Sequence, residues 1–183
     1  MPSDATQEVT LTPVADWAAL GERWRDLESR ADASFFQTWT WIGCHAAERY
    51  DDPVLLDARR AGRTVALGLF NRRRGWLTDT LWLHEIGSPQ LDSLFIEHNG
   101  LLTHAAATAE ANEALHAACL AAARQVALAG RPRARRLILS GVDATHLRAA
   151  TANGTVSGLT TRQAPALDLA ALRRNGLGHE DVL

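Results

Sequence analysis

The sequence has little cysteine, no lysine and no long apolar run. Of its 183 residues only two are cysteines, Cys44 and Cys119, and they lie far apart in the chain. There is no signal-peptide pattern and no apolar stretch of about 18 residues, so we expect a reduced, cytoplasmic protein without a membrane span. The length suits one domain that buries about 70% of its unfolded surface and needs neither disulfides nor a structural metal.

An excess of charge of one sign is also missing. The formal net charge is −2, from 19 basic residues, all arginine, and 21 acidic residues. Such a chain has no general attraction to nucleic acid or to anionic membranes, and we expect no nucleic-acid partner. Arginine clusters at 72–74 and 131–136 adjoin turns, where arginines are normally solvated, and lack the interleaved aromatic residues of single-strand grooves. Contact with phosphate or polysaccharide is the alternative for these clusters.

Patterns for metal ligands and nucleophiles are absent as well. The segment HEIGS begins at His84 like a zinc-protease motif, but the second histidine would have to replace Ser88. Cys44 adjoins His45, and neighbours on a helix point about 100° apart, so they form no thiol-histidine dyad. The remaining histidines follow no ligand spacing. We therefore assign no metal ligand and no catalytic residue.

Helical periodicity begins after Asp16, whose carboxylate can accept hydrogen bonds from the free amides of a first turn. One continuous helix face carries the apolar residues Trp17, Leu20, Trp24, Leu27 and Ala31. The pattern predicts an amphipathic helix packed on a core.

Aromatic residues gather in ASFFQTWTWIGCHAA, residues 33–47. A helix over about residues 38–49 would be apolar over most of its girth, which predicts that it is sandwiched between other elements. Phe35 and Phe36 precede it, where an apolar residue can staple the incoming chain onto the first turn. We interpret the group as an aromatic cluster that locks two helices onto a sheet. A ligand-stacking box is the alternative.

Alternating patterns predict the strands. We expect an opening strand in QEVTLTP, three antiparallel strands in VLLDARR, RTVALGLF and DTLWLHEIG, and a possible strand in LDSLFIEHNGLL with an Asn99-Gly100 turn. The short apolar segment RLILSG is typical of a strand buried on both faces. TVSGLTTR and APALDL are candidates for closing strands. Between these, the sequence predicts a long helix over about residues 111–126 and a short helix capped by Asp143.

In chain order the expected elements are β-α-α-β-β-β-(β)-α-β-α-β-β. This order resembles the GCN5-related N-acetyltransferase fold, an α/β fold with a mixed, mostly antiparallel central sheet and helices on both faces. The segments WAALGERWRDLESRADASFFQTWTWIGCHAA, RTVALGLF and LDSLFIEHNGLL are similar to the N-terminal part of CelD/BcsL-type acetyltransferases linked to cellulose and exopolysaccharide synthesis. The resemblance spans about residues 14–170. We expect one domain over residues 1–170, and the start of a linker or of a second half over residues 171–183.

The resemblance implies a double architecture. Members of the family resemble the FemAB peptidyltransferases in carrying two acetyltransferase-like halves in one chain, with the acyl-CoA chemistry in the second half. We therefore expect the N-terminal half of an acyl-CoA-dependent N- or O-acyltransferase that acts on a sugar, polysaccharide or envelope precursor. Its partner would be a second half, in cis or in trans, and this chain alone would be inactive. A non-catalytic binding or packing module and a complete single-domain acetyltransferase with an atypical CoA loop are the alternatives.

A CoA-binding loop is missing where the resemblance requires one. The family holds the CoA pyrophosphate with backbone amides of an Arg/Gln-x-x-Gly-x-Gly/Ala loop, in which glycines let the backbone close on the phosphates. The interval before the helix at Ala111 reads SPQLDSLFIEHNGLLTHAAATAE, and Gly87 and Gly100 are single turn glycines. We expect acetyl-CoA or another acyl-CoA as cofactor of the full-length protein, and no cofactor-binding residue in this chain alone.

Four polar residues near one predicted turn are the substrate-facing candidates. Asp92, Glu97, His98 and Asn99 place carboxylate, imidazole and amide groups at the end of a possible strand. In the resemblance this region lies beside the acyl donor or acceptor. Glu97 or His98 would then orient an acceptor amine or hydroxyl for the partner half. An ordinary exposed loop is the alternative.

Overall fold

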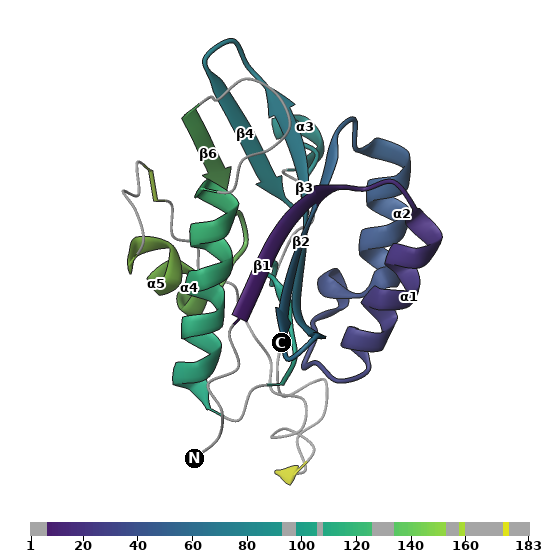
Figure 1. The fold of residues 1–183 in the computed structure, drawn as a ribbon, viewed down its shortest axis with the longest axis vertical. Helices are drawn as coiled ribbons and strands as arrows, with labels where there is room; N and C mark the ends of the chain where they lie inside the picture. The colour runs from purple at the N-terminus through teal and green to yellow at the C-terminus, as the bar shows by residue number, and fades with distance from the viewer. Residues whose placement is uncertain are drawn as a thin grey trace.

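The computed structural model describes residues 7–92, 98–105, 108–125, 134–152, 158–159 and 174–175. Within these residues a six-stranded sheet lies between two helical layers, with α1 and α2 on one face and α4 and α5 on the other (Figure 1). The strand order is β1-β2-β3-β4-β6, and β5 pairs with β3 off this path. Strands β4 and β6 are parallel, and every other described pair is antiparallel. The predicted α/β class with a mostly antiparallel mixed sheet is confirmed.

The strands lie where the period-two patterns predict them, although only β4 alternates in burial and the middle of β2 and of β3 is buried on both faces. They are β1 (Gln7–Pro13), β2 (Pro53–Arg60), β3 (Arg63–Arg74), β4 (Thr78–Leu83), β5 (Leu102–Thr103) and β6 (Ala134–Ile138). The opening strand and the three antiparallel strands are therefore confirmed, except that β4 ends at Leu83 and the predicted residues 84–87 lie outside it.

Two strand predictions need correction. LDSLFIEHNGLL is not one strand, because its first residues belong to the short helix α3 (Pro89–Asp92) and β5 begins only at Leu102. The described side chains of β6 are half-buried or exposed, so the expectation of a strand buried on both faces is wrong. Within the described residues β6 pairs only with β4. The two closing-strand candidates lie outside the described residues, apart from Gly158 and Leu159, which belong to no strand.

The helices begin at capping side chains. They are α1 (Trp17–Glu28), the 3₁₀ helix η1 (Phe35–Gln37), α2 (Trp39–Arg49), α4 (Ala109–Gln125) and α5 (Ala144–Ala152). The Asp16 carboxylate accepts a hydrogen bond from the Ala19 amide at 3.0 Å. Asp143 accepts one from the His146 amide at 2.9 Å. Both predicted caps are confirmed, because each carboxylate satisfies an amide that has no partner inside its helix.

The aromatic cluster joins the first two helices to the sheet. Trp24 is fully buried, whereas Trp17, Trp39 and Trp41 are half-buried. The Trp39 ring lies between Gly21 of α1 and Gly43 of α2, where an added Cβ would come within 2.8 and 2.6 Å of it. These glycines let the two helices close on the indole. The interpretation of the aromatics as a helix-locking cluster is therefore confirmed for Trp39 between α1 and α2. The expectation that the second helix is sandwiched is wrong, because Cys44, Ala47 and Arg49 of α2 are exposed.

The opposite face of the sheet has its own apolar core beneath α4. It includes Leu11, Leu56, Phe70, Leu81, Leu115 and Cys119. Burial raises the pKa of the Cys119 thiol to about 12, so this cysteine is an inert apolar side chain, as the sequence indicates. Cys44 is exposed. Among the helices of the described residues, none has both the length and the apolar character needed to cross a bilayer.

Candidate functional site

The candidate site lies at the carboxyl ends of the parallel strands β4 and β6. In open α/β sheets this is the edge at which ligands bind. Polar residues follow both strands there, namely His84 and Glu85 after β4 and Ser140 after β6. A cleft of about 310 Å³ adjoins them and is lined by Asp32, Ala33, Ser34, Gln37, His98, Asn99, Asp143 and His146.

Asn99 ties the two strand ends together. Its buried Nδ2 donates hydrogen bonds to the carbonyl oxygens of Leu83 at 2.9 Å and of Ser140 at 3.0 Å. Its Oδ1 accepts one from the Gly100 amide at 2.8 Å and lies 2.9 Å from Nδ1 of His84. Because Oδ1 can only accept, His84 carries its proton on Nδ1. The Asn99 amide is thus fully used inside the protein.

His84 is held as a neutral imidazole. It is almost fully buried, and this burial lowers its pKa to about 3. Its Nε2 is buried without a hydrogen-bond partner. The ring packs edge-on against Trp24, with centroids 5.8 Å apart. A cation here would be unfavourable, so His84 supports the core and is no acid or base at neutral pH.

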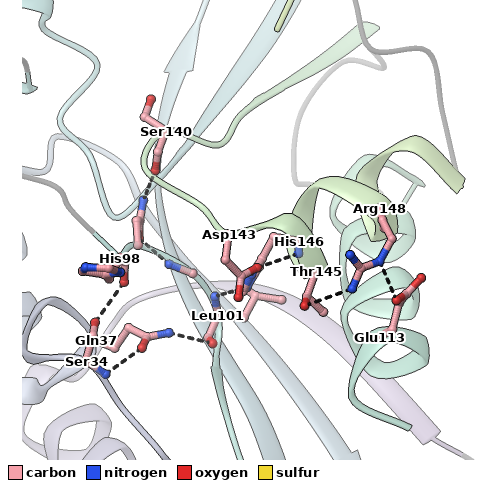
Figure 2. Close-up of polar contacts among 12 residues, drawn as sticks. Ser34, Gln37, His98, Leu101, Glu113, Ser140, Asp143, Thr145, His146 and Arg148 are labelled. Carbon is pink, nitrogen blue, oxygen red and sulfur yellow. Dashed lines mark hydrogen bonds and ion pairs between the residues drawn. The ribbon is translucent and has the colours of Figure 1, made fainter. Parts of the chain in front are cut away.

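His146 is fixed by contacts on both ring nitrogens. Its Nε2 accepts from the Leu101 amide at 3.0 Å, and its Nδ1 lies 2.8 Å from Oδ1 of Asp143 (Figure 2). The proton therefore sits on Nδ1 and points at the carboxylate. Burial acts to raise the pKa of Asp143, but the hydrogen bonds from the His146 amide and ring outweigh it and hold that pKa below its usual value. The pair is an oriented carboxylate-imidazole dyad at the cleft wall.

A second histidine covers the ring of His146. The His116 imidazole of α4 lies 4.0 Å from it, centroid to centroid, and burial lowers the pKa of His116 to about 4. On another side, a Cβ added to Gly100 would come within 2.5 Å of Cε1 of His146. Among the described residues no group of three or more His, Cys, Asp or Glu side chains could hold a metal ion. The His146 ring is thus packed between His116 on one side and Gly100 on another.

Glu85 is a buried carboxyl that sequence reasoning missed. It is 2% exposed, and its Oε2 accepts a hydrogen bond from Oγ of Ser140 at 2.9 Å. Burial, with a smaller effect of the Asp92 charge, raises the pKa of Glu85 to about 7. No signal in the sequence pointed to it, because the strand predicted over DTLWLHEIG includes Glu85, whereas β4 ends at Leu83. A carboxyl with this pKa can exchange a proton near neutral pH.

Asp92 closes the loop that follows β4. Its carboxylate accepts hydrogen bonds from three successive amides, those of Ile86 at 2.8 Å, Gly87 at 2.7 Å and Ser88 at 2.7 Å. Successive amides pointing to one centre form a concave anion-binding nest. In this protein the anion in the nest of residues 86–88 is the protein's own carboxylate.

The four predicted substrate-facing residues are in different environments. Asp92 binds the nest and Asn99 is buried between the strand ends. His98 is exposed on the cleft, and its carbonyl oxygen accepts from Oγ of Ser34 at 2.9 Å. Glu97 lies outside the described residues. The substrate-facing role of these residues stays a prediction.

The Asn99-Gly100 dipeptide does not form the tight turn that the sequence indicates. Asn99 makes an isolated parallel bridge with Val142, and the residue with left-handed backbone is His98, at φ 54°. The burial of the Asn99 side chain explains the difference, because its amide serves strand ends that are distant in sequence.

The rim of the cleft is joined to its floor by Gln37 of η1. Its Nε2 donates to the Leu101 carbonyl at 3.0 Å, and its Oε1 accepts from the Ser34 amide at 2.9 Å (Figure 2). The lining thus combines hydroxyl, amide, imidazole and carboxylate groups on a braced backbone. Such a set can orient a polar ligand that carries hydroxyl or amino groups.

Comparisons with known proteins leave this site to be interpreted from its own geometry. Neither a scan against protein-family models nor searches of the curated proteins and of the solved structures find a match.

Proposed function

We propose that this chain is the acceptor-side half of an acyl-CoA-dependent acyltransferase. Its cleft would receive an amine or hydroxyl of a sugar, polysaccharide or envelope precursor, and a second acetyltransferase-like half would bind the acyl-CoA. The observation that carries the proposal is the nest of residues 86–88. It lies directly after β4, where the resemblance expects the CoA phosphates, and it holds the carboxylate of Asp92.

Occupation of the nest disfavours a phosphate at this position. Asp92 is tethered only four to six residues from the amides it binds, so its effective concentration there far exceeds that of a free ligand. A phosphate would have to displace this carboxylate and would leave it without its three donors.

The composition of the cleft favours a hydroxylated or amino acceptor. Ser34, Gln37 and His98 contribute hydroxyl, amide and imidazole groups, whereas Asp32 and Asp143 contribute carboxylates with their negative charge. This charge would attract an ammonium or hydroxyl group and repel the phosphates of CoA. The lining therefore supports the acceptor side of the reaction over the donor side.

Calorimetry with acetyl-CoA tests the proposal. Titration of the chain in about 0.15 M salt should give only weak heat that disappears at higher salt, because scattered arginines attract phosphate without orienting it. A saturable one-to-one isotherm in the micromolar range would contradict the proposal and favour a complete acetyltransferase with an atypical loop.

A second titration examines the cleft itself. Glucosamine at millimolar concentration should perturb the NMR signals of Ser34, His98 and His146, and the variant Ser34→Ala should weaken this binding. Leu91→Ser, which changes an exposed side chain outside the cleft lining, is the matched control. If glucosamine and other amino or hydroxyl sugars leave these signals unchanged, the chain is better described as a non-catalytic packing module.

A further inference from the structure

The hairpin between β3 and β4 carries an exposed apolar apex. It projects beyond the helical layers at the top of Figure 1. At its apex Trp76 is 90% exposed and Leu77 is 70% exposed, more than any other large apolar side chain of the described residues. The Gly75 amide donates a hydrogen bond to the Thr78 carbonyl at 2.9 Å, so Trp76 and Leu77 form the two-residue loop between them. A Cβ on Gly75 would lie 2.8 Å from that oxygen, which is why the turn uses glycine.

Positive charge lies directly behind the apex. Arg73 of β3 is exposed, and its Nε donates to the carbonyl oxygen of Ile86, which leaves its charge uncompensated. Arg136 of β6 is exposed and pairs in register with Thr80, on the far side of β4. Neither guanidinium forms an ion pair with a described residue. By contrast, Arg74 is paired with Asp52 at 2.9 Å.

We propose that this hairpin tip inserts into the interface of an anionic lipid membrane. Trp76 and Leu77 would enter the boundary between headgroups and acyl chains, where the amphipathic indole of tryptophan is favoured. The guanidinium groups of Arg73 and Arg136 would bind lipid phosphates, whose geometry matches the arginine fork. This inference is independent of the proposed acyltransferase function.

The dimensions of the hairpin fit such an insertion. Strand residues rise by about 3.4 Å each, which places the backbone of Arg73, and that of Arg136 beside Thr80, about 10 Å behind the apex, with the Arg73 guanidinium turned further back toward Ile86. Interfacial segments bury their apolar side to a depth of about 5 to 10 Å, so the arginines would reach the headgroups as the apex enters the acyl boundary. The arrangement, with apolar residues at the apex and cations behind them, is that of a shallow wedge.

The alternative occupant, a protein partner, fits less well. A stable protein interface needs about 800 Å² on each side, and the apolar area here is confined to two side chains on a narrow turn. The net charge of −2 is no obstacle to membrane binding, because charges further than about 8 Å away are screened at physiological salt. The attraction of the tip to anionic lipid therefore depends on the local positive charge behind the apex.

Vesicle flotation with the full chain tests the proposal. We expect the protein to float with vesicles of phosphatidylcholine containing roughly 30% phosphatidylglycerol, and not with phosphatidylcholine alone. The double variant Trp76→Ser/Leu77→Ser should reduce partitioning by about tenfold, because both apolar anchors are lost. Arg136→Gln should reduce it by about fivefold, and added salt should weaken the wild type further. Leu91→Ser is the control and should float like the wild type.

Three outcomes would overturn the proposal. The first is a wild-type chain that stays with the unbound fraction on anionic vesicles. The second is a double variant that floats as well as the wild type, which would show that the apex is not the contact. The third is a chain that ignores vesicles but self-associates in sedimentation velocity, with the association lost in the double variant, which would identify a second copy as the occupant. Circular dichroism of each variant confirms that the fold is retained.

Discussion

The two ends of strand β4 are built in opposite ways. At the carboxyl end Leu83, His84 and Glu85 are buried, and side chains from other segments bind their polar atoms. Just before the amino end, Trp76 and Leu77 are exposed to solvent. A strand of six residues thus connects a buried, hydrogen-bonded region with an exposed apolar loop.

Residues at the carboxyl end of β4 therefore contribute to the stability of the fold, whereas those at the hairpin tip are available for contact with other molecules. A hydrogen bond lost in a buried place leaves its partner unsatisfied, whereas an exposed side chain exchanges its neighbours for water at little cost. Substitutions at the carboxyl end of β4 should therefore change the free energy of unfolding, and those of the exposed Trp76 and Leu77 at the hairpin tip should not. Variants at four places test this comparison, from the largest expected effect to the smallest.

Asn99→Ala should have the largest effect. It removes the donors to the Leu83 and Ser140 carbonyls and the acceptor for the Gly100 amide, all at the buried junction of β4 and β6. We expect a loss of about 3 to 5 kcal/mol in the free energy of unfolding, measured by urea denaturation. Asn99→Asp keeps the acceptor and loses the donors. An unchanged urea midpoint for Asn99→Ala would show that the junction does not depend on this side chain.

Asp92→Ala should have the next largest effect. The three amides of residues 86–88 lose their common acceptor, and water can replace it only in part because the site is half-buried. We expect a loss of about 2 to 3 kcal/mol in the same urea assay. Asp92→Asn, which retains one acceptor oxygen, should lose less. Equal stability of the wild type and both variants would contradict the closed-nest description.

Glu85→Gln should change stability with pH. Burial raises the pKa of Glu85 from 4.5 to about 7, so between these values the folded chain binds more protons than the unfolded chain. The contribution of Glu85 is therefore fully present below about pH 4.5 and is lost as the pH rises through 7. Relative to the wild type, the glutamine variant should gain about 2 to 3 kcal/mol between pH 5 and pH 8.

Urea denaturation of the wild type and of Glu85→Gln at several pH values measures the difference in their free energies of unfolding. The lowered pKa values of His84 and His116 act in the opposite sense, with stability lost as the pH falls below 6.5, but they are common to both proteins and cancel in the difference. A difference that does not vary with pH would mean that Glu85 titrates normally.

Trp76→Ser and Leu77→Ser should have the smallest effect on stability. Both side chains are exposed and neither is part of a core cluster, so each variant should lie within about 0.5 kcal/mol of the wild type in urea. Gly75→Ala is the contrast, since its Cβ would meet the Thr78 carbonyl and open the turn. A large loss of stability in Trp76→Ser would show that the tip packs against the protein and would remove the contrast between the two ends of β4.

Local sequence signals predicted most of the secondary structure. The caps Asp16 and Asp143 and the apolar faces of the first two helices act over three or four residues, so a single sequence contains all the information they need. The alternating strands β1 to β4 follow the same rule with a period of two. The short helix α3 was missed because the contacts of Asp92 with residues 86–88 outweigh the alternating pattern around it.

By itself the sequence determined the α/β class, the order of the elements from β1 to β4 and the aromatic cluster that joins the first two helices, because each depends on periodicity and on short-range capping. Only the tertiary structure decided the site. Asn99 bonds to groups 16 and 41 residues away, and Ser140 reaches Glu85 across 55 residues. Such contacts arise where β4 and β6 pair in parallel, and the spacing of residues along the chain does not predict them. The burial that raises the pKa of Glu85 and the carboxylate that fills the nest both result from this meeting of distant segments.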